Sequence, residues 1–279
     1  MVAFESTGEQ WWQRVWRLLW RAPRRGQWFS RWFIKALAGL VLVPSLALWY
    51  EPFLLPYAAG VLVWLMGIAV WWQWLGTRHF GAWLAGATTL TLFWASSFVF
   101  WLFLENPSYR VLWLVLLALC SWWYLTEWHR LRQRLFVGEP LVASAPNLTL
   151  GFLIAFTLGV SAESFLVYLD ASVFSLFLVF YLPLVASFIA LAKLSGWSPL
   201  QAPVYPITAA VLLAQVFALV TWWPTSFYVA GFTLAVTYLV VALVVRQESQ
   251  GFLNRRSFWR ELGVLLGSLA LVLLSARWV

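Results

Sequence analysis

Long apolar stretches dominate the pattern along this chain, and short polar connections separate them. Nine of these stretches approach or exceed the roughly 20 apolar residues that a helix needs to cross a hydrocarbon layer of about 30 Å. They lie near residues 32–50, 53–75, 80–104, 110–128, 148–169, 172–195, 203–222, 226–245 and 259–278. Open strands cannot satisfy their backbone groups in lipid, and no alternating pattern suggests a barrel. The sequence therefore predicts an all-α fold, a polytopic transmembrane helical bundle.

Connection lengths divide the predicted spans into two groups. A basic, cytoplasmic loop at 129–147 is the longest internal connection, and it separates a first four-helix group, 32–128, from a second group, 148–279. The second group has four helices plus a short ninth. Only fifteen residues lie between Glu261 and Arg277, about 22 Å of helix at 1.5 Å per residue. This ninth segment either crosses with its charged ends reaching the surface or is only partly inserted.

Charge decides the predicted orientation. The chain has 18 Lys and Arg residues and a net charge of +8. If the N-terminus is cytoplasmic, all of these cations except Arg110 and Arg277 fall on the cytoplasmic side, as expected for membrane helices. The C-terminus is then external if the ninth segment crosses. We therefore expect a protein of a bacterial cytoplasmic membrane whose basic face binds anionic headgroups, and we expect no nucleic-acid partner.

The first segment, 1–31, has the pattern of an amphipathic helix at the membrane surface. Polar residues recur there at helical spacing and aromatic residues occupy the opposite side. The residues expected to bind the membrane surface are Trp11, Trp12, Arg14, Trp16, Arg17, Trp20 and Arg21. Pro23 and Gly26 are expected to end this helix. Docking to a partner subunit is the alternative role for the same face.

Composition and motifs argue against catalysis. Hydrophobic residues make up 63% of the chain and charged residues 10%, and no phosphate-binding glycine loop, metalloprotease motif or nucleophile elbow is present. His79 and His129 lie beside arginines, and Cys120 is the only cysteine, so the sequence predicts neither a metal site, a disulfide nor a cofactor. Most of the 23 tryptophans fall near span ends as aromatic belts, and we expect Trp64 and Trp94, at depth, to serve packing.

One ionisable residue, Glu163, falls inside a predicted span. It lies seven residues, about 10 Å, from Asp170 at the outer end, and ionisable residues at such depth are candidate functional sites. It continues a predicted close-packing series formed by Gly151, Ala155 and Gly159; Gly263 and Gly267 form a second such pair. Four other polar residues have comparable depth and complete the candidate intramembrane site: Ser96, Ser97, Gln215 and Thr233.

Two roles for Glu163 stay open at this point. It is either the base of an outward-facing polar cavity or a neutral, hydrogen-bonded packing element, and Arg110 is the nearest candidate for an ion pair. Pro44 and Pro183 fall within spans and should bend them, a feature of transporters and of static bundles alike.

The function that follows is that of a non-catalytic membrane subunit or assembly protein, with another membrane subunit as partner. A small-solute or proton-coupled transporter that uses Glu163 is the alternative. A lipid-modifying enzyme is a distant third hypothesis, because no nucleophile, metal set or pair of acids supports it.

Overall fold

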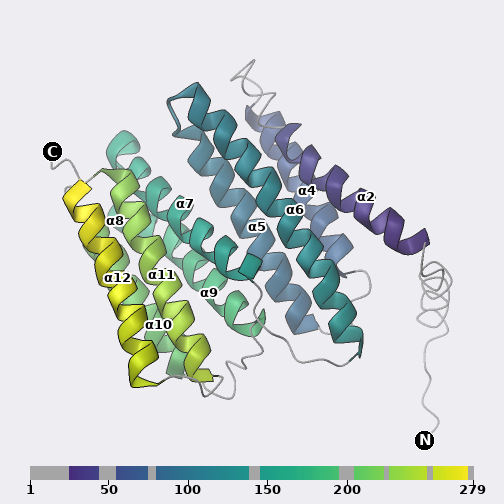
Figure 1. The fold of residues 1–279 in the computed structure, drawn as a ribbon. Helices are drawn as coiled ribbons and strands as arrows, with labels where there is room; N and C mark the ends of the chain where they lie inside the picture. The colour runs from purple at the N-terminus through teal and green to yellow at the C-terminus, as the bar shows by residue number, and fades with distance from the viewer. Residues whose placement is uncertain are drawn as a thin grey trace, which may run out of the picture.

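The computed structural model of the chain describes residues 25–43, 55–74, 80–137, 145–194, 204–222, 226–249 and 254–275. Within these ranges every regular element is a helix, which confirms the all-α prediction. The helices lie side by side in one elongated bundle (Figure 1). They are α2 (Arg25–Leu40), α4 (Leu55–Trp74), α5 (Phe80–Leu102), α6 (Pro107–Val137), α7 (Ala145–Leu169), α8 (Val173–Leu176), the π-helix η2 (Phe177–Tyr181), α9 (Leu182–Leu194), α10 (Val204–Thr221), α11 (Phe227–Ser249) and α12 (Arg255–Ser275).

Six of the described helices are long and apolar enough to cross a membrane. They cover Pro56–Trp74, Phe80–Leu102, Pro107–Leu131, Ala145–Leu169, Phe174–Leu194 and Phe227–Glu248. The apolar part of α10, Ile207–Thr221, is shorter, and α2 and α12 are not among the six. Six such helices in one chain indicate an integral membrane protein, while the count of nine spans stays a prediction.

The centre of the bundle is α7. It packs most extensively on α11 and also contacts α5, α9 and α6, and every residue from Thr157 to Ser164 is buried. α5 packs more extensively on α7 and α9 than on α4 or α6. The two predicted helix groups are therefore joined into one core, and α2 and α12 lie at opposite edges of it (Figure 1).

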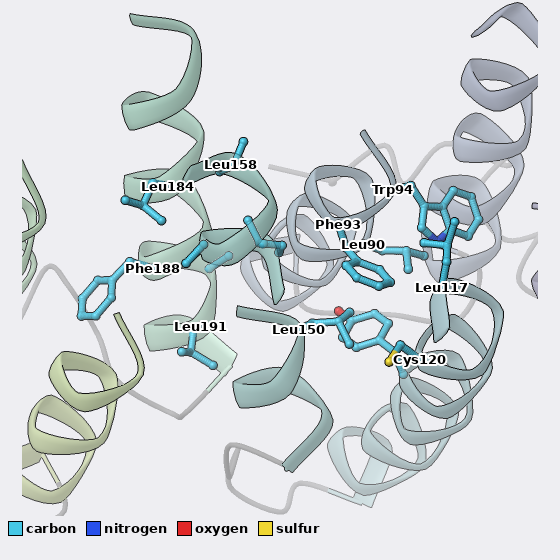
Figure 2. Packing of buried hydrophobic residues seen from close by; sticks show 14 of the residues in the cluster. Leu90, Phe93, Trp94, Leu117, Cys120, Leu150, Leu158, Leu184, Phe188 and Leu191 are labelled. Carbon is cyan, nitrogen blue, oxygen red and sulfur yellow. The ribbon is translucent and has the colours of Figure 1, made fainter. Parts of the chain in front are cut away.

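Interdigitated large side chains fill the core between these helices. Leu90 and Phe93 of α5 lie near Leu150 of α7, and Phe188 of α9 belongs to the same cluster (Figure 2). All four are at most 3% exposed. Burial of such side chains stabilises a soluble core by removing them from water, but between membrane helices the gain comes mainly from close packing.

Glycines allow the closest helix approaches. A Cβ atom at Gly159 would lie 2.8 Å from the Cα atom of Gly231 on α11, and one at Gly151 would lie 2.7 Å from Cε1 of Tyr238. Both distances are too short for real carbon contacts. Ala155, between these glycines on the same face of α7, is fully buried. The face predicted for close packing on α7 is therefore the face that meets α11.

Cβ atoms added to the glycines of α12 would meet no such contact. A Cβ atom at Gly263 or Gly267 would meet no atom within 4 Å, and both glycines are exposed. Within the described chain this predicted packing pair contacts nothing.

Two helix boundaries differ from the sequence-based expectation. α6 continues to Val137, so the first part of the expected loop 129–147 is helical. The reason is local, because this part is rich in Arg, Leu and Gln, which favour helices, and the first helix breaker is Gly138. α2 begins at Arg25 and contains Gly26, which was expected to end the preceding helix.

The predicted amphipathic helix before Pro23 lies outside the described residues, and so do its seven proposed membrane-binding side chains. Pro44 also lies outside them. These predictions are not tested by the structure.

The two tryptophans expected to serve packing have different environments. Trp94 is fully buried, and its indole Nε1 donates a hydrogen bond to Oγ of Ser121 on α6 at 2.8 Å. Trp64 on α4 is 67% exposed, so the packing expectation is wrong for it within this chain. The difference arises because α5 is central whereas α4 lies near one edge (Figure 1).

Candidate functional site

Glu163 lies where the glycine-containing face of α7 ends. Gly159, one helical turn earlier, meets Gly231, and the carboxyl group follows the same face toward the end of the helix at Asp170. The side chain of Glu163 is 6% exposed. α7 ends there because Asp170 adopts a positive φ of 49°, which ends the regular helix, and the Ala171 amide donates to the Phe165 carbonyl.

The Thr221 hydroxyl, on the last residue of α10, lies near the Glu163 carboxyl group. This hydroxyl donates its hydrogen bond to the Phe217 carbonyl oxygen at 2.8 Å. The second carboxyl oxygen, Oε1, is buried and has no hydrogen-bond partner among the described residues. One nearby hydroxyl offers much less than the hydration that a carboxylate loses on burial, so the Glu163 carboxyl group is poorly solvated at this site.

A π-helical turn flanks this site. The rings of Phe177 and Tyr181 in η2 stack with centroids 4.3 Å apart, and each lies 6.3 Å from the ring of Phe217 on α10. The Tyr181 hydroxyl donates to the carbonyl of Ala210, which fastens η2 to α10. The turn widens just before Pro183, whose ring would collide with the carbonyl of residue 179 in a regular helix.

Four buried hydroxyl residues lie on α5 and α7, near the contact between Ser96 and Thr157, and we call them the hydroxyl seam (Ser96, Ser97, Thr157 and Ser161). The Thr157 hydroxyl lies 2.8 Å from Oγ of Ser96. The hydroxyl oxygens of Ser97 and Ser161 are buried without a partner among the described residues. A buried hydroxyl group without a hydrogen-bond partner lowers stability. A water molecule or a conformational change that supplied a partner to the hydroxyl seam would remove this cost.

α7 itself separates the hydroxyl seam from Glu163. Successive residues of an α-helix are rotated by about 100°, so Thr157 and Glu163 lie about 120° apart around α7. Ser161 and Glu163 are about 160° apart by the same count. The serines on α5 and the carboxyl group therefore belong to different faces of α7 and do not line one cavity.

Gln215 and Thr233 do not join Glu163 either. Gln215 is exposed on the outer side of α10. Thr233 is buried on α11, but it follows Gly231 by two residues and so faces about 160° away from the surface that meets α7. Of the five residues predicted to form one site, only Ser96 and Ser97 lie close together, and they do so because they are neighbours in the sequence.

Arg110, the candidate ion-pair partner, binds elsewhere. Its Nε donates to the Leu104 carbonyl, and its guanidinium lies over the Trp101 ring, 5.3 Å from the centroid. Among the described residues, no ion pair involves Glu163.

Sequence reasoning missed Thr221. The depth of Thr221 was readable, because it lies four residues before the predicted outer turn at Thr225. Its orientation was not, since a uniformly apolar helix such as α10 gives no indication of which face is buried.

Metal-binding chemistry has no visible basis in the described part of the chain. No three His, Cys, Asp or Glu side chains approach one another there closely enough to hold an ion. His129 is buried with its ring stacked on Trp72 at 6.5 Å, and Cys120 is buried. His79 lies outside the described residues.

Comparison with known proteins adds no family: no family model, curated protein or solved structure matches the chain.

Proposed function

We propose that the protein is a non-catalytic subunit of a membrane assembly, and that the open glycine face of α12 binds a transmembrane helix of a partner subunit. The observation that carries this proposal is the contrast between two kinds of glycine. Gly159 and Gly231 are required by the packing of the chain on itself, whereas Gly263 and Gly267 face open space. Glycines four residues apart on an exposed membrane helix favour close approach of a second helix.

The attachment of α12 supports this role. Glu261, 6% exposed, accepts hydrogen bonds at one carboxylate oxygen from Gln247 of α11 at 2.9 Å and from Arg260 at 2.7 Å. The bond from Gln247 holds the first turns of α12 against α11, and the bond from Arg260 lies within α12. The exposed glycine face lies beyond them along the helix, so a fixed surface is offered at the edge of the bundle (Figure 1).

Site-directed photo-crosslinking in native membranes tests the proposal. A photoreactive residue at Ala270, which is exposed one turn beyond Gly267, should form one defined adduct with a different protein. Gly267→Leu should abolish this adduct, because a large side chain prevents close helix approach. Gly39→Leu is the matched control, since Gly39 is also open but lies on α2 at the opposite edge.

The outcomes separate clearly. Adducts with lipid alone, or an adduct of unchanged yield in the Gly267→Leu variant, would contradict the proposal. An adduct with a second copy of the chain would replace the partner subunit by self-association through α12.

The second candidate function is proton-coupled or facilitative transport, which one observation favours. Oε1 of Glu163 is buried without a partner among the described residues, as expected for a group that exchanges a proton or a ligand. If Glu163 carries protons across the membrane, vesicles containing the purified protein should dissipate a proton gradient, and Glu163→Gln should abolish this flux without changing the fold. Ser161→Ala is the control, because it alters a buried unpaired group on another face of α7. Vesicles that stay proton-tight with the unaltered protein would contradict proton transport through Glu163.

A further inference from the structure

The outer face of α10 carries a regular exposed stripe. One or two exposed residues recur at each helical turn: Ile207, Thr208, Val211, Leu212, Gln215, Ala218, Leu219 and Trp222. The residues between them, such as Leu213 and Phe217, are buried against the bundle. This spacing, about 3.6 residues per turn, places all of them on one face of α10.

Gln215 makes this stripe unsuitable for lipid alone. α10 lies beside α9 and α11, which have the length and composition of spans, and Gln215 is the twelfth of its eighteen residues. The distance along the helix from Gln215 to Thr221 at its end is roughly 9 Å. An amide at this depth meets hydrocarbon, which can neither donate nor accept a hydrogen bond. The described part of the chain provides no hydrogen-bond partner for it.

We propose that this stripe is the interface between two copies of the chain, with Gln215 of each copy hydrogen-bonded to Gln215 of the other. Two copies inserted in the same membrane have the same orientation, so a two-fold axis runs along the membrane normal and the α10 helices are parallel. Identical residues then meet at the same depth. A glutamine amide both donates and accepts, so it is complementary to itself.

The neighbours of Gln215 fit this arrangement. Val211 and Leu212 lie one turn before it and Ala218 and Leu219 one turn after it, so apolar side chains enclose the amide pair on both sides. A single polar position within an apolar seam fixes the register of two helices. A different partner would need its own polar group at the matching depth, whereas a second copy supplies it automatically. The inference does not depend on the role proposed for α12.

Disulfide trapping in native membranes tests the geometry first. In a Cys120→Ala background, Ala218→Cys should form a covalent dimer on mild oxidation, because position 218 lies on the seam. Val63→Cys lies on α4, which is far from α10, and is also exposed, so this variant should stay monomeric. No Ala218→Cys dimer, or a dimer of equal yield at Val63→Cys, would overturn the proposal.

The role of the amide is tested by sedimentation of the purified protein in mild detergent. The unaltered chain should show a monomer–dimer equilibrium, and Gln215→Leu should weaken it by about 3- to 15-fold, the range measured for hydrogen bonds between membrane helices. Val63→Ala should leave it unchanged. A chain that sediments only as monomer, or a Gln215→Leu dimer of unaltered affinity, would refute the self-complementary contact.

Discussion

A methyl group added at Gly159, where α7 contacts α11, should destabilise the protein. Gly159→Ala places a methyl group 2.8 Å from the Cα atom of Gly231 and 3.3 Å from Cδ2 of Leu234. Carbon atoms in contact prefer about 3.5–4.0 Å, and the Gly231 atom belongs to the backbone, so the helices must separate by up to about 1 Å. Overpacking of this kind costs about 1–3 kcal/mol. The higher helix propensity of alanine raises the free energy of unfolding by at most about 1 kcal/mol. We expect a net loss of about 1–2 kcal/mol.

The assay is unfolding of the purified protein by SDS titration from mild detergent, followed by tryptophan fluorescence. Gly267→Ala is the matched control, because its methyl group meets no atom within 4 Å and should leave the free energy of unfolding unchanged or slightly raised. If Gly159→Ala unfolds at the same SDS concentration as the unaltered protein, the close approach of α7 to α11 is refuted, and with it the placement of Glu163 on a protein-facing surface.

Three further predictions concern other contacts. Trp94→Phe removes the donor of the hydrogen bond to Ser121, and SDS unfolding should show a loss of about 1 kcal/mol that largely disappears when Ser121→Ala is already present. Gln247→Ala removes one donor to Glu261, so limited proteolysis near the start of α12 should become faster; an unchanged rate would show that this bond does not hold the helix. A peptide of residues 8–26 should become helical on anionic vesicles and dissociate at high salt, and binding that ignores salt would mean that tryptophan burial dominates.

Hydropathy was enough to find the helices, because a membrane helix must satisfy its own backbone and therefore forms a continuous apolar run. Hydropathy did not predict where the helices end. α6 passes its apolar part and continues as a basic helix to Val137, since Arg and Gln support helix formation as well as Leu does. The orientation in the membrane also stays a prediction, which reporter fusions after Arg134 and near Asn106 would test.

Neighbours of each helix could not be read from the sequence. α5 packs on α7 and α9 rather than mainly within its own predicted group, because close packing depends on which faces carry small residues. The same limit explains the two tryptophans at depth, since nothing in their local sequence distinguishes the central helix of Trp94 from the peripheral helix of Trp64.

The candidate site shows most clearly that the sequence does not predict which face of a helix is buried. Counting residues from the outer turns predicted similar depths for Glu163 and Gln215, and the two were grouped on that basis. Rotation about the helix axis then separated them, because Gln215 faces outward whereas Thr221, six residues later, faces Glu163. In a helix without a polar face, the sequence gives the position of a residue along the helix, but the direction in which its side chain points depends on the helices packed around it.

The π-helical turn at Phe177–Tyr181 has a consequence for the variation this protein can tolerate. A turn closed by an i to i+5 bond holds one residue more than a regular α-turn. Deleting one residue there would restore a regular turn without changing the rotation of Leu184 and Phe188 relative to α5 and α7. Homologous chains should therefore differ by single-residue gaps at this turn more readily than anywhere else within the central helices, and those with the gap should lack the proline at position 183.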